Sequence, residues 1–157
     1  KPNYAYLDLR YSLTQALPLG TAIAWANRLQ LAADPLISNE QMNAGGLDSV
    51  RGYFEAEQLG DYGLQTNLEF QSPNVGPRLS ERIQTFYGYV FTDWAGLRLH
   101  DPLPDQDGSF GLFSSGLGLR FSGLGLLGSL NWAHAFTDGA TTKAGDNRWL
   151  FQLRYGF

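Results

Sequence analysis

The alternation of apolar and polar residues with a period of two is the feature that most constrains how this chain can fold. In the clearest segment, residues 64–71, apolar or hydroxyl side chains alternate with Gln65, Asn67, Glu69 and Gln71. Successive side chains of a β-strand point to opposite faces of the sheet, so this pattern predicts a strand with one apolar and one polar face. Segments of roughly ten residues with such alternation are typical of transmembrane β-barrels.

Seven segments of this kind follow one another along the chain, at residues 6–13, 22–31, 64–71, 82–99, 113–121, 126–136 and 148–157. Short turns near residues 19, 75 and 123 alternate with long loops at residues 33–61, 100–109 and 137–147. Outer-membrane barrels have short periplasmic turns and longer external loops. The sequence therefore predicts an all-β fold, an antiparallel transmembrane β-barrel, in which residues 1–157 form a single domain.

A soluble β-sandwich also shows alternation, and it is the main alternative fold. Three features favour the barrel. The apolar face is rich in aromatic residues, the long loops all fall on one predicted side, and the chain ends in a strand with a terminal aromatic residue. Aromatic residues make up 14% of the chain and charged residues only 17%, below the usual quarter. No apolar run approaches the roughly 18 residues that a transmembrane helix needs.

Composition and motifs also argue against several functions. A net charge of −4 argues against nucleic-acid binding, and the absence of cysteine excludes disulfides and thiolate metal sites. His100 and His134 are far apart in the sequence and lack nearby ligand-type partners, so we predict no metal site and no cofactor. A lipid-active enzyme with Ser114 or Ser115 as nucleophile and His134 as base is the competing class, but no third group supports it. We predict no enzyme activity.

The stretch Gly45–Phe54 contains an arginine in an unusual setting. Its central motif is Val50, Arg51, Gly52 and Tyr53. Loop arginines normally seek water, but the apolar and aromatic neighbours of this one indicate a folded, docked loop. A guanidinium in a confined space keeps its charge and needs a carboxylate to satisfy its planar fork. In a barrel, we therefore expect the long loop of about residues 33–61 to fold into the polar lumen and to find a carboxylate there.

Several short motifs occur in order along the chain: Leu36–Gln41, Gly45–Tyr53, Gly60–Gly63 and Leu68–Pro73. Together with the terminal Phe157, they resemble the C-terminal barrel region of two-partner-secretion transporters of the haemolysin secretion/activation type. These transporters belong to the bacterial surface antigen superfamily of outer-membrane assembly and translocation barrels. The resemblance extends over essentially the whole chain. It implies a location in the bacterial outer membrane and the transport or membrane insertion of an unfolded polypeptide client, without a cofactor.

The resemblance also implies a partner for the arginine. In this superfamily the arginine loop folds back into the lumen and meets the aspartate of a Phe-x-Asp-x-Gly motif on a following strand. The matching residues here are Phe91 and Asp93, with Ala95 in place of the motif glycine. If Asp93 faces the lumen, Tyr89 and Phe91 face it too. We hypothesise that Arg51 pairs with Asp93 and locks the loop in the lumen; the alternative is that Asp93 is a strand-end residue in water.

The last segment carries a second functional prediction. One of its faces resembles the C-terminal signal that the bacterial barrel-assembly machinery reads, with Phe151, Leu153, Tyr155 and Phe157. The same side chains would face outer-membrane lipids in any barrel. Deleting Phe157 is expected to impair membrane assembly more than folding in detergent.

The number of predicted strands leaves the architecture open. Members of the resembling family have about sixteen strands, preceded by periplasmic polypeptide-binding domains, so seven strands would correspond to the C-terminal half. An odd number cannot close an all-antiparallel barrel. We therefore expect a fragment, a short protein with an eighth strand hidden in the long loop, or one protomer of a homo-oligomeric barrel. The alternative to polypeptide transport is a small structural or pore-forming barrel without secretion activity.

Overall fold

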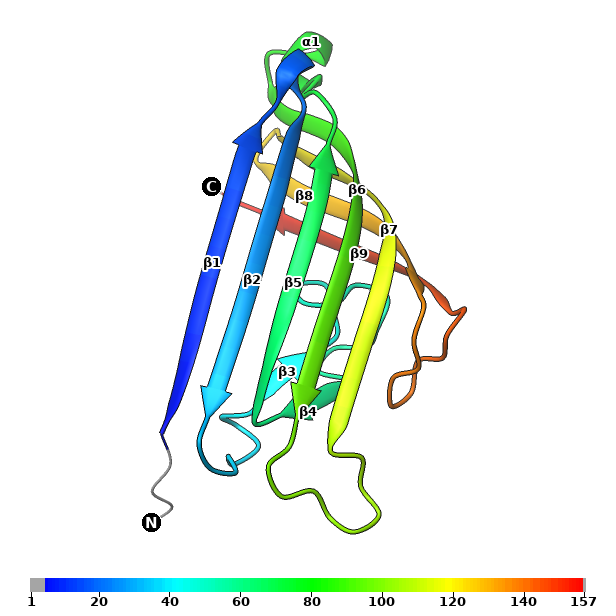
Figure 1. Cartoon of the computed structure of the whole chain (residues 1–157). Coiled ribbons are helices and arrows are strands. Elements are labelled where there is room, and N and C mark those ends of the chain that lie inside the picture. Colours follow the sequence, from blue (N-terminus) through cyan, green and yellow to red (C-terminus); the bar gives the residue numbers. More distant parts are fainter. Residues whose placement is uncertain (1–4, 157) are drawn as a thin grey trace.

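The structure, a computed structural model, describes residues 5–156 as one long curved β-sheet and a small two-stranded ribbon (Figure 1). The main sheet contains β1 (Tyr6–Ala16), β2 (Ala22–Ala32), β5 (Tyr62–Gln71), β6 (Ile83–Arg98), β7 (Ser109–Gly123), β8 (Leu126–Ala135) and β9 (Asn147–Tyr155). The ribbon pairs β3 (Met42–Ala44) with β4 (Gln58–Gly60). Two short helical turns are η1 (Pro18–Gly20) and α1 (Gly76–Leu79).

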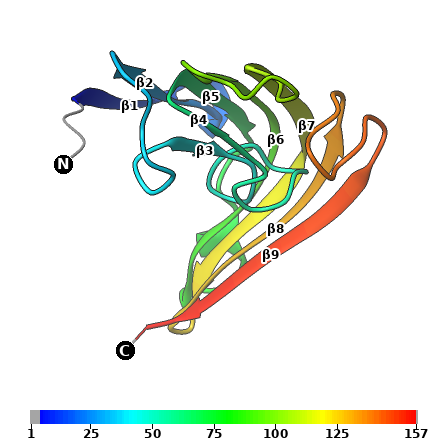
Figure 2. The same cartoon turned by 90° about the horizontal axis from the view of Figure 1, so that it is seen from below.

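The main sheet has the simplest possible topology. Its strand order is β1-β2-β5-β6-β7-β8-β9, and every neighbouring pair is antiparallel. These strands coincide with the seven alternating segments, so the predicted all-β antiparallel fold is confirmed. The sheet curves strongly, as Figure 2 shows, and β1 and β9 form its two edges within residues 5–156. The described strands are therefore an open part of a barrel wall.

The connections alternate between the two ends of the sheet, but they do not separate by length as the sequence predicts. One end holds η1, the two-residue turn at Leu124 and Gly125, and the connection of residues 72–82 with α1, which is as long as that of residues 136–146 and longer than that of residues 99–108. The connections predicted to be long, residues 33–61, 99–108 and 136–146, start from the other end of the sheet (Figure 1). Neither helical turn is long, and no helix within residues 5–156 has the length and apolar content to traverse a membrane.

The long connection between β2 and β5 contains the ribbon, which the alternation pattern does not predict. Each ribbon strand has three residues, and the two pair only with each other in the sheet order. The eighth strand considered above therefore does not join the main sheet within the described residues. Figure 2 places the ribbon inside the curve of the sheet. An apolar cluster joins it to the sheet there, made of Met42, Ala44, Val50, Tyr53, Ala95, Leu97, Leu112 and Ala135.

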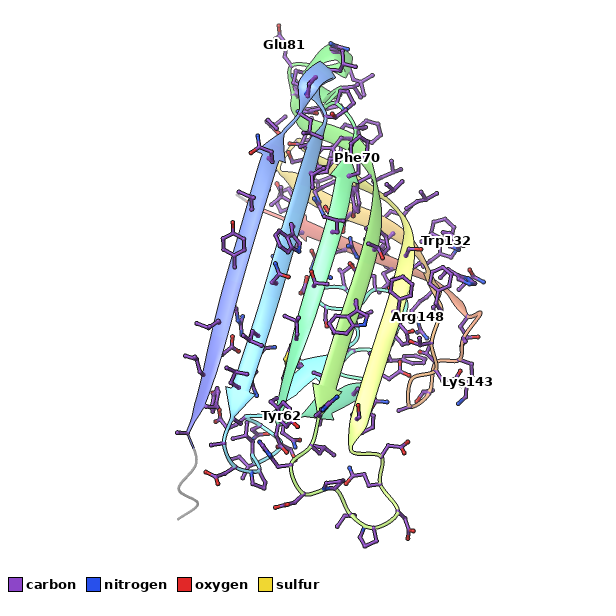
Figure 3. All side chains as sticks on the ribbon, viewed as in Figure 1. Tyr62, Phe70, Glu81, Trp132, Lys143 and Arg148 are labelled. Atoms are coloured by element: carbon purple, nitrogen blue, oxygen red, sulfur yellow. The ribbon has the colours of Figure 1, made fainter. Side chains whose placement is uncertain are left out.

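The two faces of the sheet differ in burial, and on β6 they follow the register that the resemblance implies for Asp93. On β6, Tyr89 and Phe91 are each 4% exposed and Asp93 is fully buried, whereas their neighbours Val90 and Trp94 are 49% and 38% exposed. The convex face carries many such exposed apolar side chains, which Figure 3 draws along the strands. Among them are Leu9, Trp25, Leu68, Phe70, Leu117, Leu119 and Leu130. The concave face therefore holds the ribbon and the polar groups, and the convex face is apolar.

Candidate functional site

The arginine loop, defined here as residues 45–57, is the tip of the ribbon. Gly45, Gly46 and Gly52 adopt φ angles of 111°, 102° and 98°, a region that only glycine enters easily. A Cβ at Gly45 would also overlap the carbonyl oxygen of Phe54. The glycines therefore allow the loop to fold tightly on itself, which leaves Val50 and Arg51 in its interior with exposures of 0% and 5%.

Arg51 and Asp93 form the central contact of the site. The guanidinium is bidentate: Nε donates to Oδ2 of Asp93 at 2.7 Å, and Nη2 donates to Oδ1 at 2.8 Å. The backbone N–H of Arg51 donates to the same carboxylate at 3.0 Å. Arg51 comes from the loop and Asp93 from β6, 42 residues later. This pair thus fixes both the side chain and the backbone of the loop to the sheet.

A second carboxylate completes the shell of Arg51. Its third nitrogen, Nη1, donates to Oε1 of Glu69 on β5 at 2.7 Å. Arg120 on β7 approaches the same carboxylate from the other side, with both of its contacts at 3.3 Å, and donates to the hydroxyl of Tyr87 at 2.8 Å. Two arginines and two carboxylates therefore balance each other on the concave face, across β5, β6 and β7.

An aromatic platform lies beneath the guanidinium groups. The Cζ atom of Arg51 sits 3.6 Å from the centroid of Phe91, and that of Arg120 sits 4.6 Å from the centroid of Tyr89. Cation–π contacts of this kind stabilise a desolvated cation. The ring of Tyr89 can lie against β7 because residue 118 is glycine: a Cβ at Gly118 would overlap that ring.

Neutral side chains on β5 hold the loop beside the arginine. Asn67 donates to Oδ1 of Asp93 at 2.8 Å and to the carbonyl of Ser49 at 2.5 Å. The hydroxyl of Ser49 donates to Gln65 at 3.0 Å and accepts from the backbone N–H of Gly45. The polar face of β5, the clearest feature of the sequence, is thus the surface on which the loop rests.

Gly52 and Tyr53 carry the loop across β7 and β8. A Cβ at Gly52 would lie 3.2 Å from Cβ of Ala133 and 3.5 Å from Cβ of Ser114, so the loop backbone packs closely on two small residues. The hydroxyl of Tyr53 lies 2.8 Å from the carbonyl of Thr137 and 2.9 Å from that of Phe113. All four residues of the central motif therefore contact the sheet or the loop interior.

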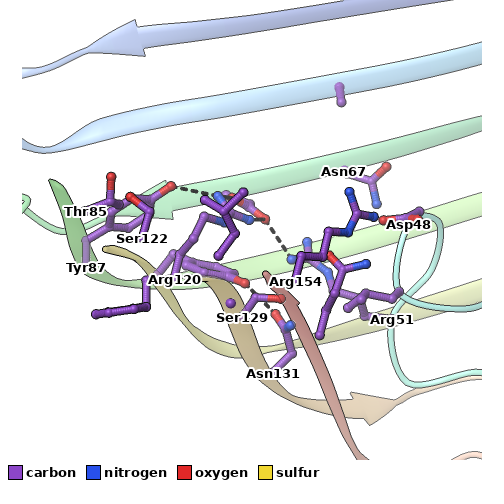
Figure 4. Close-up of a pocket in the computed structure, with 18 residues that line it drawn as sticks. Asp48, Arg51, Asn67, Thr85, Tyr87, Arg120, Ser122, Ser129, Asn131 and Arg154 are labelled. Atoms are coloured by element: carbon purple, nitrogen blue, oxygen red, sulfur yellow. Dashed lines mark hydrogen bonds and ion pairs between the residues drawn. The ribbon is translucent and has the colours of Figure 1, made fainter. Parts of the chain in front are cut away.

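An open cavity of about 590 Å³ lies next to Arg51 and Arg120 on the concave face (Figure 4). Its lining is polar and aromatic, and it extends to β8 and β9. Residues that line it include Asp48, Asn67, Tyr87, Arg120, Ser129, Asn131, Gln152 and Arg154. The arginine loop forms one wall, so a movement of the loop would change the size of this space.

The structure does not assemble the competing enzyme site. Ser115 and His134 are cross-strand partners, but within residues 5–156 no hydrogen bond joins their side chains. The ring of His134 instead contacts the amide oxygen of Asn147 at 3.0 Å. Ser114 points to the other side of β7, where it is buried. Among the described residues no cluster of histidine and acidic side chains could hold a metal ion.

The described residues of the predicted C-terminal signal lie on the outer side of the edge strand β9. Phe151, Leu153 and Tyr155 are 79%, 65% and 64% exposed, more than the apolar residues of the inner strands. Phe157 lies outside the described residues. The structure thus places three of the four side chains on one accessible face.

Sequence reasoning missed four residues that complete the site: Glu69, Asn67 and Arg120 around Arg51, and Glu57 in the same loop. For Glu69 a signal was present, because a carboxylate on the inward face of a strand needs a cation nearby. No sequence pattern indicates which cation it pairs with.

These features define a class. A curved antiparallel sheet with an apolar convex face and an arginine loop bound to its concave face is typical of the wall of an outer-membrane β-barrel. The family model of the haemolysin secretion/activation proteins ShlB/FhaC/HecB matches residues 1–121. The chain belongs to this family of two-partner-secretion transporters, which lie in the outer membrane of Gram-negative bacteria and are not enzymes. The resemblance predicted from the motifs is confirmed.

A solved structure supports the fold. The chain is similar to CdiB from Acinetobacter baumannii, with a TM-score of 0.63 and 21% sequence identity. The match covers 95% of this chain and 27% of that chain, so the 157 residues span about a quarter of the length of CdiB. A comparison with curated protein sequences finds no match.

Proposed function

We propose that the arginine loop is a lock in the lumen of a two-partner-secretion barrel, and that its release accompanies passage of an unfolded polypeptide client. The observation that carries this proposal is the pairing of Arg51, 5% exposed, with Asp93, which is fully buried. The concave face would line the lumen, and the loop would occupy it. Outer-membrane lipids would cover the convex face.

The energetics of the pair suit a lock. Removing one partner of a buried ion pair costs about 3–5 kcal/mol, because an uncompensated charge remains. Arg51 would leave both Asp93 and Glu69 without its guanidinium if the loop withdrew. A docked loop is therefore favoured until water or a client replaces these contacts. Such a pair specifies one conformation, which is the best-supported role of buried charges.

Client secretion tests the proposal. Arg51→Ala and Asp93→Ala should each reduce secretion of the polypeptide client at equal levels of folded transporter. The double variant should resemble the single ones, because residues that act as a pair do not give additive effects. Arg78→Ala, in the exposed turn α1, is the matched arginine control and should secrete normally. Normal secretion by both single variants would refute a lock that transport depends on.

The alternative is a structural or pore-forming barrel, including a homo-oligomeric one, that keeps the fold without secretion. This alternative is supported by the two open edges of the described sheet, β1 and β9. Conductance in planar bilayers together with client secretion by the full-length protein separates the two. Ion conductance without any client secretion would favour the pore.

A further inference from the structure

Glu57, at the end of the arginine loop, binds a second segment of the chain. Its Oε1 accepts hydrogen bonds from the backbone N–H groups of Thr141 and Thr142 at 2.8 and 2.6 Å. Its Oε2 accepts from the hydroxyl of Thr142 at 2.6 Å and from the N–H of Phe54 at 2.8 Å. One carboxylate thus bridges the loop and the β8–β9 connection, residues 136–146.

The β8–β9 connection is shaped around this carboxylate. A Cβ at Gly139 would overlap Oε1 of Glu57 and would lie 3.2 Å from the ring of Tyr53, so a larger residue there would displace the carboxylate from its present position. The N–H of Gly139 donates to the carbonyl of Thr142 at 2.8 Å, which closes a turn over the carboxylate. Thr142 is 1% exposed although it lies in a surface connection. Such burial of a polar side chain requires the partner that Glu57 supplies.

Two further contacts flank the carboxylate. The hydroxyl of Tyr53 accepts from the N–H of Thr137 at 3.2 Å, at the start of the connection. Just beyond the connection, on β9, the guanidinium of Arg148 lies 3.5 Å from the ring centroid of Phe54, and its Nε donates to the carbonyl of Gly52 at 3.3 Å. The arginine loop is therefore contacted by the start and middle of the connection and by the strand that follows it.

The charge of Glu57 is favoured in this setting. Burial raises the pKa of its carboxyl, but the hydrogen bonds from Thr142, Thr141 and Phe54 outweigh burial and hold the pKa below its usual range. Glu57 is therefore ionised at neutral pH, and the bonds that it accepts are charge-assisted and strong. None of these donors belongs to the network around Arg51.

We propose that Glu57 is a positioning residue that clasps the β8–β9 connection to the arginine loop, so that the two segments undock as one unit. The role of the clasp in transport rests on the proposed function. The clasp would determine whether residues 136–146 move together with the arginine loop when the Arg51–Asp93 pair opens. Arg51 ties the loop to β5 and β6, and Glu57 ties it to the segment that leads into β9. A loop released from Asp93 would then carry residues 136–146 with it.

Hydrogen–deuterium exchange of the full-length protein tests the clasp, read from peptides that cover residues 45–57 and 136–146. Thr142→Val removes the hydroxyl donor to Glu57 with little change in shape. Losing one hydrogen bond to a charged group should raise the opening constant about tenfold or more, and exchange should quicken in both segments. Thr141→Val is the matched control, because Thr141 donates only through its backbone. It should leave exchange unchanged.

Two more variants distinguish the clasp from a general packing effect. Thr142→Ser restores a hydroxyl and should return exchange in both segments towards the natural rate. Glu57→Gln keeps the size of the side chain but removes its charge, and should act like Thr142→Val. Faster exchange in only one segment, or in neither, would overturn the clasp, as would an equal response to Thr141→Val.

The outcomes also separate the clasp from the lock. If Thr142→Val loosens both segments while Arg51→Ala leaves secretion intact, the clasp stands and the lock fails. If Arg51→Ala reduces secretion while Thr142→Val leaves exchange unchanged in both segments, the lock stands and the clasp fails.

Discussion

At the scale of single residues, the site depends on how the side-chain N–H donors of Arg51 are divided between two carboxylates. Arg51 gives two side-chain bonds to Asp93 and one to Glu69, and its remaining face lies on Phe91. Lysine could not reproduce this arrangement, because its ammonium is a single point rather than a planar fork. The pairing with Asp93 could be proposed from motifs in the sequence. Glu69 could not, since nothing local relates residue 69 to residue 51.

Ala95, which replaces the motif glycine, is also explained at this scale. It lies two residues after Asp93 on the same concave face and is 1% exposed. Its methyl group packs in the apolar cluster with Val50 and Tyr53. The substitution therefore adds a contact between the sheet and the loop and leaves the aspartate in place.

Glycine at position 118 makes a residue-scale prediction. Gly118→Ala should push the ring of Tyr89 away from β7, because a Cβ at residue 118 would overlap that ring. The cation–π contact between Arg120 and Tyr89 should then be disturbed. Overpacking of this kind costs about 1–3 kcal/mol. The free energy of unfolding in a folding-competent detergent should fall by that amount. Gly111→Ala on the same strand is the control, since a Cβ there meets nothing within 4 Å; equal losses for both variants would contradict the explanation.

At the scale of elements, period-two alternation was enough to find the strands of the main sheet and to assign the faces of most of them. Both faces of β6 carry aromatic residues, so its register was predicted from the position of Asp93 in the family motif. The ends of β6, Ile83–Arg98, lie within one residue of the predicted segment 82–99, whereas β7, Ser109–Gly123, extends beyond the predicted segment 113–121 at both ends. The ribbon escaped prediction for a physical reason. Its strands have three residues each, and their pairing depends on tertiary contacts of Met42 and Ala44 with the sheet rather than on their own pattern.

The edge strand β9 carries the assembly prediction. Phe151→Ser should reduce insertion into the outer membrane in cells more than folding in detergent, if the outer face of β9 is the signal for the barrel-assembly machinery. Phe70→Ser on the inner strand β5 is the matched control, because Phe70 is also an exposed aromatic residue of the convex face. Membrane fractions probed for folded protein provide the measurement. Equal defects in both variants would indicate lost lipid contact instead of lost recognition.

At the scale of the whole molecule, the concave face divides into three zones along the strands. The apolar cluster holds the ribbon near the long connections, the charged network around Arg51 lies next to it, and the open cavity follows. The arginine loop spans from β5 to β8 and contacts Arg148 of β9. One loop thus links most strands of the described sheet, and its position would set the free space inside a closed barrel.

The central claim is that Arg51 holds the loop inside the lumen, and the accessibility of Asp48 tests it most directly. Asp48 lines the cavity beside Arg51, and the chain has no cysteine, so Asp48→Cys places one thiol in this chain. Asp48 is exposed to this cavity, which a closed barrel would enclose, so a bulky, membrane-impermeant maleimide applied to intact cells should label the thiol slowly. Combined with Arg51→Ala, labelling should become much faster as the loop moves outward, while Ala140→Cys at the exposed β8–β9 connection reacts rapidly throughout. Equally slow labelling of Asp48→Cys with and without Arg51 would contradict the lock.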